Sequence, residues 1–180
     1  DPVETGAVTL CLPQDTQAEA FDYPESFLKK KVWHLDRHSL NQRALKEAVK
    51  ILSSAQKPLI VAGGGVHYSI ASETLRSFAE IFGIPVSETQ AGKSAMSWKD
   101  PMSVGAVGVT GTSAANLLAK AADVVLVVGS RLQDFTTASK NVFDEDVKLL
   151  HLNVNKLDAL KMGSIMLEAD AKSGLESLKD

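Results

Sequence analysis

The sequence predicts an α/β fold, a doubly wound parallel sheet with helices on both faces. Residues 59–62 and 124–128 are continuous apolar runs without alternation, which is typical of strands buried on both faces. Three glycines, Gly63 to Gly65, follow the first run, and an amphipathic segment from Ser69 to Phe82 comes next. Strands and helices then alternate to the end of the chain, which is the order of consecutive βαβ units.

Length and charge narrow the classes of function. The 180 residues fit one domain with an appendage, and the 44% apolar content is enough for a sizeable core. The net charge of −3, without a basic stripe, argues against a nucleic-acid partner. No apolar run reaches the roughly 18 residues that span a bilayer, and Cys11 is the single cysteine. We therefore expect a cytoplasmic protein without a membrane partner, and the first residue, Asp1, indicates an excerpt from a longer chain.

The first part of the chain reads differently from the rest. Residues 7–12 form a short apolar run that predicts a strand, but no partner strand precedes it. Residues 13–38 have no sustained period and contain the exposed run Lys29 to Lys31, so they read as a linker. The compact part is predicted to begin at residue 37.

The first elements of the compact part follow from spacing and caps. Ser39 and Gln42 match a capping box, and a helix follows whose apolar face is formed by Leu45, Ala48, Val49 and Leu52. The strand at 59–62 leads through the glycines to the second helix, which Gly83 ends as a C-terminal cap. Residues 84–89 are predicted as the next strand.

The second half repeats this order. Residues 105–111 read as a loop of small residues, and Thr112 or Ser113 can cap the helix that contains Ala114, Leu117, Leu118 and Ala121. Strands are predicted at 124–128, 148–154 and 165–169, and helices at 156–161 and 171–178.

Ligands of open α/β sheets bind beyond the carboxyl ends of the strands. The predicted rim is rich in glycine, hydroxyl and amide groups and has one cation, which suits a neutral or anionic ligand; its residues are Gly63, Gly64, Gly65, Thr89, Gln90, Gly129, Ser130, Arg131, Asn153 and Asp170. The alternative is that the glycines only make tight turns, because they match neither GxGxxG nor a Walker loop. No nucleophile has a neighbouring base, and the histidines are scattered, with His151 read as a core or edge residue. The sequence therefore predicts no catalytic residue and no metal site.

Several segments carry a resemblance to a known family. Residues 6–15, 60–66, 83–93, 108–112 and 128–137 together resemble the middle domain of the thiamine-diphosphate enzymes, the relatives of acetolactate synthase, pyruvate oxidase and benzoylformate decarboxylase. The resemblance implies a Rossmann-like domain of the NAD/FAD-binding type, over residues 37–180. Residues 1–36 then correspond to the last strand of a pyrimidine-binding domain and a linker. The implied partners are flanking pyrimidine- and pyrophosphate-binding domains and further copies in a dimer or tetramer.

Within that family, residues 13–24, 88–93 and 134–139 resemble the members that hydrolyse a carbon–carbon bond of a cyclic diketone in myo-inositol catabolism. This resemblance implies thiamine diphosphate and Mg²⁺ as cofactors. In the family, the residues that hold them belong to the other two domains. The chain by itself is therefore expected to be catalytically silent.

Some members of the family bind FAD or ADP on this domain, at positions that match the rim together with Val109, Thr110 and Val154. Asn153 and Asn155 stand where flavin-binding members have acidic residues, and Gln133 to Phe135 replace an Asp-Asp-Arg run. We therefore expect no flavin, and at most weak binding of adenine nucleotides to backbone donors of the glycine loops and to Arg131. An ion pair of Arg131 with Asp134 or Asp170 is the alternative.

Two other functions stay open at this point. One is a free-standing nucleotide-binding module of the deoxyhypusine-synthase-like or sirtuin-like type. The other is a fragment of an acetolactate-synthase-like subunit with a working flavin site. The unpartnered run at residues 7–12 favours part of a larger enzyme, because it fits the end of another domain better than a free-standing module.

Overall fold

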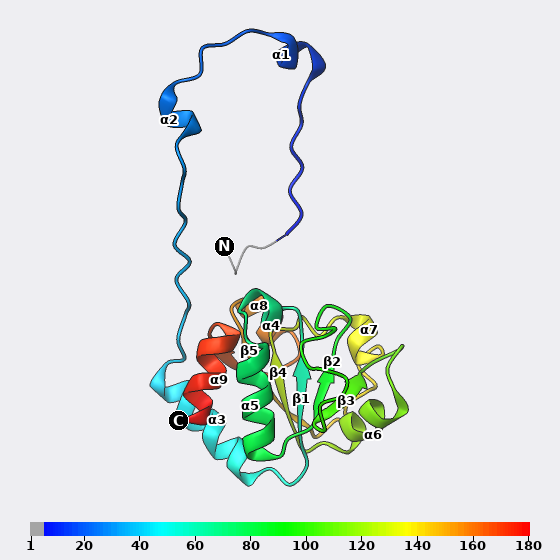
Figure 1. Ribbon diagram of the computed structural model, residues 1–180. Coiled ribbons are helices and arrows are strands. Elements are labelled where there is room, and N and C mark those ends of the chain that lie inside the picture. Colours follow the sequence, from blue (N-terminus) through cyan, green and yellow to red (C-terminus); the bar gives the residue numbers. More distant parts are fainter. Residues whose placement is uncertain (1–5) are drawn as a thin grey trace. The chain divides into compact units, whose positions relative to one another are not determined.

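The computed structural model describes residues 6–180, which fall into two units, one up to Asp36 and one from Arg37 to Asp180. The second unit is built on a six-stranded sheet in the order β3-β2-β1-β4-β5-β6, and all neighbouring strands are parallel (Figure 1). The strands are β1 (Pro58–Ala62), β2 (Val86–Glu88), β3 (Ser103–Ala106), β4 (Val124–Val128), β5 (Lys148–Asn153) and β6 (Ile165–Glu168). The predicted parallel α/β class is confirmed.

Helices cover both faces of the sheet, which explains why its central strands lack alternation. Ile60 and Leu126 point into one apolar cluster, which they share with α3 (Gln42–Ser54), α5 (Ser72–Phe82) and α9 (Ala171–Lys179). Their neighbours Leu59 and Val125 point into a second cluster on the other face, which they share with α6 (Ser113–Ala121). Figure 1 shows α5 and α9 on one side of the strands and α6 on the other.

The first helix of this unit, α3, begins later than the sequence predicts. Asn41 is the N-cap, and its Oδ1 accepts a hydrogen bond from the Ala44 N–H at 2.9 Å. The predicted capping box at Ser39 and Gln42 is therefore wrong, because an asparagine two residues later supplies the cap. Val49, predicted on the apolar face, is 42% exposed.

The amphipathic segment predicted to open at Ser69 is two helices, α4 (Gly65–Tyr68) and α5. Ser69 is the buried C-terminal cap of α4 rather than the start of a helix. Ile70 separates the two helices with φ +54°, a left-handed conformation that a β-branched residue rarely adopts. Gly83 ends α5 in the left-handed conformation, as predicted.

Two elements of the second unit, β3 and α7 (Asp134–Thr137), are absent from the sequence-based prediction. β3 overlaps the first two residues of the predicted loop 105–111, and its four residues are all half-buried. The short helix α7 follows β4 and ends at Ala138 with a left-handed φ of +47°. Neither segment has an apolar run or a sustained period, because each is short and lies near the surface.

The remaining elements agree with the prediction to within one or two residues. Thr112 caps α6, and its Oγ1 accepts from the Ala115 N–H at 3.1 Å. β4, β5, α8 (Lys156–Leu160), β6 and α9 follow in the expected order. Gly129 follows β4 with φ +60°, where a side chain would be strained.

The first unit has no strand among its described residues. The run at residues 7–12, predicted as a strand, has no ladder, and Val8, Leu10 and Leu12 are 92%, 79% and 62% exposed. The predicted strand is therefore wrong for the described residues, because a strand needs a neighbour to pair its backbone groups and the first unit contains no other strand.

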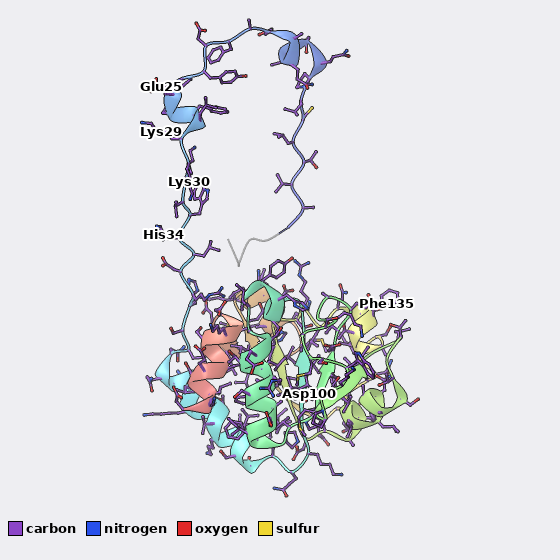
Figure 2. The ribbon with its side chains drawn as sticks, viewed as in Figure 1. Glu25, Lys29, Lys30, His34, Asp100 and Phe135 are labelled. Atoms are coloured by element: carbon purple, nitrogen blue, oxygen red, sulfur yellow. The ribbon has the colours of Figure 1, made fainter. Side chains whose placement is uncertain are left out.

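Two short helices interrupt the predicted linker, α1 (Gln14–Ala18) and α2 (Glu25–Leu28). Each begins after a proline in extended conformation and carries an acidic residue in its first turn. All their residues are exposed, and the predicted solvated run at Lys29 to Lys31 is exposed as well (Figure 2).

We expect deletion of residues 1–36 to leave a folded domain. Every described residue up to Asp36 is exposed, and the first buried apolar residue is Leu40. Calorimetric unfolding of residues 37–180 is expected within about 2 °C of the full chain, the shift of a change below ~1 kcal/mol.

A deletion of residues 1–41 is the matched control, because it also removes Leu40 and the Asn41 cap of α3. It is expected to lower the midpoint clearly. Loss of cooperative unfolding in the shorter deletion would contradict the boundary at residue 37.

Candidate functional site

The order of the strands places a switch point at the centre of the sheet. β1 and β4 are neighbours, but the chain leads from β1 toward β2 and β3 and from β4 toward β5 and β6. In open α/β sheets, ligands bind beyond the carboxyl ends of the strands at such a point. The loops that begin there carry Gly63 to Gly65 and Gly129 to Arg131, so the structure brings these two predicted groups together.

The other predicted residues lie along the same edge of the sheet. Because all strands are parallel, their carboxyl ends share one edge, which is the upper edge of the sheet in Figure 1. The loops or strand ends there carry Thr89, Gln90, Val109, Thr110, Asn153 and Asp170. Nucleotide binding by these residues stays a prediction, and the contacts of each one show what it does in the fold.

The glycines at the switch point allow two backbone segments to touch. A Cβ on Gly65 would lie 2.6 Å from the Gly129 Cα, and a Cβ on Gly63 would lie 2.6 Å from the Ser130 Cα. The loops after β1 and β4 therefore pack backbone to backbone, and a side chain at either position would force them apart.

This packing uses the donors that a phosphate would need. The Gly63 N–H donates to the Val128 carbonyl and the Gly65 N–H to the Gly129 carbonyl, both at 2.8 Å. Among the three glycines, only Gly64 has an N–H that makes no hydrogen bond with the described residues. The loop therefore presents a single glycine donor, the Gly64 N–H, because the other two join the loops after β1 and β4.

The second glycine loop, residues 108–111, is also used internally. Gly108 has φ +104°, and its backbone packs directly on the Phe135 and Thr136 carbonyls of α7. Its N–H and carbonyl form a double hydrogen bond with the Asn116 side-chain amide, each at 2.9 Å. The Val109 N–H donates to the Phe135 carbonyl at 2.9 Å. This loop therefore anchors α7, whose Phe135 is 59% exposed (Figure 2).

The carbonyl of Ser130 is the centre of a buried polar network. It accepts from the His151 Nε2 at 2.7 Å and from the Asn153 Nδ2 at 2.9 Å. The Asn153 Oδ1 in turn accepts from the Asn155 N–H at 2.9 Å. Both ends of the Asn153 amide thus have partners within the domain, and these bonds fix the orientation of the side chain.

His151 takes part in this network, although the sequence indicated only a core or edge residue. The side chain is fully buried on β5, and because a carbonyl only accepts, its Nε2 carries the proton. The Nδ1 is buried without a hydrogen-bond partner. Burial lowers the pKa of His151 from its usual 6.5, and the bond with Ser130 offsets part of this. Of the nearby charges, Lys161 lowers the pKa further and Asp158 raises it.

Arg131 pairs with a residue that the sequence did not indicate. Its Nε lies 3.5 Å from the Asp158 Oδ2, and its side chain is 71% exposed. The alternative of an internal ion pair is therefore correct, but its partner is neither Asp134 nor Asp170. The first turn of α8 brings Asp158 to Arg131, and Asp134 accepts from Ser139 instead. An exposed pair of this kind contributes about 1 kcal/mol or less, so Arg131 stays accessible to a ligand.

Asp170, predicted on the nucleotide rim, is a structural residue. Its carboxylate is 1% exposed and accepts from the Arg37 Nη1 and the Ser69 Oγ, both at 2.7 Å. The other oxygen caps α9, accepting from the Lys172 N–H at 3.0 Å and the Ser173 N–H at 3.3 Å. No oxygen of this carboxylate is left for a ligand hydroxyl.

The end of β2 holds a buried acid that the sequence did not single out. Glu88 is 3% exposed, and its Oε1 accepts from the Met96 N–H at 2.8 Å. The next residue, Thr89, is also buried, and its Oγ1 accepts from the Gly92 N–H at 3.0 Å. Both side chains close the loop after β2 on itself, whereas Gln90 is exposed. A polar residue inside a predicted strand gave no signal of this role.

Residues 45–178 match the family model of the thiamine pyrophosphate enzyme central domain. The chain belongs to this family. The fold agrees with the assignment, because a putative thiamin diphosphate-dependent enzyme from Mycobacterium smegmatis superposes on 82% of the chain with a TM-score of 0.69. At 21% sequence identity this neighbour supports the fold alone, and the match covers 29% of its own chain.

Curated relatives of this central domain are more similar in sequence. The chain is 48% identical over 99% of its length to a 3D-(3,5/4)-trihydroxycyclohexane-1,2-dione hydrolase of Clostridium tetani. Proteins of the same name from Geobacillus thermodenitrificans and Bacillus cereus are 47% and 46% identical over the whole chain. The chain spans 28% of the length of these relatives.

The residues of this domain do not fit thiamine diphosphate and its metal ion. Mg²⁺ is held in proteins by carboxylate and carbonyl oxygens, often together with a diphosphate. Residues 6–180 contain no group of three histidine, cysteine or acidic side chains that could hold a metal ion. Two acids at the carboxyl edge, Glu88 and Asp170, are buried and form hydrogen bonds with the protein's own groups.

Among residues 6–180, no helix is long and apolar enough to cross a membrane.

We expect the domain to lose stability in mild acid through His151. The pKa of His151 is lower in the folded chain than in the unfolded chain, so the unfolded chain binds the proton more readily. The free energy of unfolding is therefore highest above pH 6.5 with respect to this group, and it decreases as the pH falls below 6.5. Urea unfolding at a series of pH values measures this loss.

The variant His151→Gln keeps a donor for the Ser130 carbonyl and removes the titration, so its stability should fall less between pH 6.5 and 5. His34→Gln, in the exposed linker, is the control and should follow the native chain. Equal slopes for all three proteins would show that His151 does not titrate in this range.

We expect no more than weak binding of ADP, FAD or NAD. A ligand present at a thousand times its dissociation constant stabilises the folded state by about 4 kcal/mol, which moves the midpoint by roughly 8 °C or more in a protein of this size. In a thermal-shift series with millimolar nucleotide, we expect shifts below about 2 °C, because the glycine donors, Asn153 and Asp170 are already bound.

Arg131→Ala tests whether any shift depends on the accessible cation, and Lys148→Ala, at the amino end of β5, is its matched control. A large stabilisation by FAD that disappears only in the Arg131 variant would show a working flavin site.

Proposed function

We propose that the chain is the central domain of a thiamine-diphosphate-dependent enzyme that hydrolyses a carbon–carbon bond of 3D-trihydroxycyclohexane-1,2-dione, a cyclic diketone of myo-inositol catabolism. The domain itself is structural and catalytically silent. Thiamine diphosphate and Mg²⁺ are bound by the flanking pyrimidine- and pyrophosphate-binding domains of the whole protein, which is cytoplasmic and assembles as a homo-oligomer.

One observation carries this proposal. The curated relatives that align with the whole chain at 46–48% identity share the name of this hydrolase. Their similarity extends through the linker as well as through the residues of the family model, which begins at residue 45. Because the linker has no buried residues that a conserved core would require, its similarity supports a shared enzyme rather than a shared fold alone.

The geometry of the rim supports the structural role. The groups that could have bound a ligand instead hold β1, β4, β5 and α9 together, through Gly63, Gly65, Asn153 and Asp170. A domain of this kind provides a rigid body to which neighbouring domains attach.

Two alternatives fit the structure less well. An acetolactate-synthase-like fragment with a working flavin site needs free donors where Gly63 and Gly65 are bonded, and an acceptor where the Asn153 amide is already used. A free-standing nucleotide-binding module needs the same donors, and it offers no reason for a linker that aligns with enzymes over three times as long.

A domain exchange tests the proposal. We expect the Clostridium tetani hydrolase to keep activity on the dione within about tenfold when this chain replaces its aligned segment, because the two segments are 48% identical. The assay follows hydrolysis of the dione by the purified chimera.

The matching segment of the Mycobacterium smegmatis enzyme, with the same fold at 21% identity to this chain, is the control insert and should give a chimera without this activity. The 180-residue chain alone is the second control, and calorimetric titration with thiamine diphosphate and Mg²⁺ should show no saturable binding. A folded but inactive chimera with this chain, or micromolar binding by the isolated chain, would contradict the proposal.

A further inference from the structure

Three segments that lie far apart in the sequence meet at Asp170. The linker arrives through Arg37, the turn between α4 and α5 contributes Ser69, and α9 begins after Asp170 itself. The Arg37 Nη1 and the Ser69 Oγ donate to the same carboxylate oxygen, each at 2.7 Å. The guanidinium and the hydroxyl are therefore held against each other by one buried acceptor.

Hydrogen bonds to the carbonyl of His38, the residue after Arg37, hold the chain beside Asp170 as well. The His38 carbonyl accepts from the Asp170 N–H at 2.9 Å and from the Ser173 Oγ at 2.6 Å. The Ser69 Oγ also accepts weakly from the Ala171 N–H, at 3.3 Å. The entry of the chain into the domain is thus fixed by both a side chain and a carbonyl.

We propose that Asp170 is the joint that fastens the linker to the central domain, so that it sets at Arg37 the point from which the preceding part of the protein extends. In this role Asp170 is a positioning residue and touches no substrate or cofactor. The inference goes beyond the proposed function, because it holds whatever reaction the whole protein catalyses.

Burial makes this ion pair costly to break, unlike the exposed ion pairs of the domain. The Asp170 side chain is 1% exposed and that of Arg37 is 34% exposed, so solvent screens their attraction only partly. By contrast, Arg76 pairs with Glu73 on the surface of α5, where the two side chains are 44% and 79% exposed. Removing one partner at Asp170 leaves the other without its charge-assisted hydrogen bond.

The turn that carries Ser69 is strained in a way that fits this role. Ile70 follows Ser69 with φ +54° and a side chain that is 78% exposed. A β-branched residue holds this conformation only where its surroundings determine it. The Ile70 N–H donates to the His67 carbonyl and the Ala71 N–H to the Val66 carbonyl, so the turn is closed and Ser69 faces inward.

Limited proteolysis of the 180-residue chain with trypsin tests the joint. Lys29, Lys30 and Lys31 are exposed and supply an internal reference for cleavage in the linker. In the native chain we expect cleavage after Arg37 to be at least about tenfold slower than after Lys31. Asp170→Asn keeps an acceptor to cap α9 but loses the charge, so it should speed cleavage after Arg37 about tenfold and leave the reference unchanged.

Glu73→Gln makes the same acid-to-amide change in the exposed pair and should not alter cleavage after Arg37. If Asp170→Asn does not fold, Arg37→Gln retains the carboxylate, and faster hydrogen exchange of the Asp170 amide would report release of His38. Native cleavage after Arg37 as fast as after Lys31 would overturn the proposal. Unchanged cleavage in a folded Asp170→Asn, or unchanged exchange in Arg37→Gln, would do the same.

Discussion

The contact between two backbones at the centre of the sheet is the constraint on which the rest of the domain depends. Gly63 and Gly65 lie against Gly129 and Ser130 at distances that leave no room for a Cβ. This contact lets β1 and β4 end side by side, and it places the Ser130 carbonyl where His151 and Asn153 can both donate to it. The order of the other strands is built outward from this pair.

The carboxyl edge therefore lies where open α/β sheets bind ligands, but many of its polar groups form hydrogen bonds within the domain. Gly63, Gly65, Asn153 and Asp170, which the sequence predicts at a nucleotide-binding rim, form hydrogen bonds with the protein's own groups. Asp170 shows this most clearly, because its carboxylate accepts from Arg37 and Ser69 and also caps α9. The internal use of these groups supports the structural role that we propose for the domain.

The buried strands of the core could be predicted from the sequence, but the hydrogen-bond and ion-pair partners of the rim residues could not. Continuous apolar runs such as residues 124–128 predict buried strands because burial on both faces selects the residue types directly. β3 could not be predicted because backbone hydrogen bonds hold this edge strand, and these bonds produce no recognisable pattern of residue types. The pairings of Arg131 and Asp170 also could not be predicted, since their partners Asp158 and Arg37 are brought close only by the completed fold.

The two edge strands, β3 and β6, limit how readily the sheet can pair with a strand of another molecule. β3 and β6 have four residues each, and the register between β2 and β3 shifts at Val86 and Ser87. On β6, Glu168 forms an ion pair with Lys156 at 3.3 Å. Short, irregular or charged edges are poor templates for a strand from another molecule. The edges of this sheet therefore offer little opportunity for pairing with a strand of another molecule.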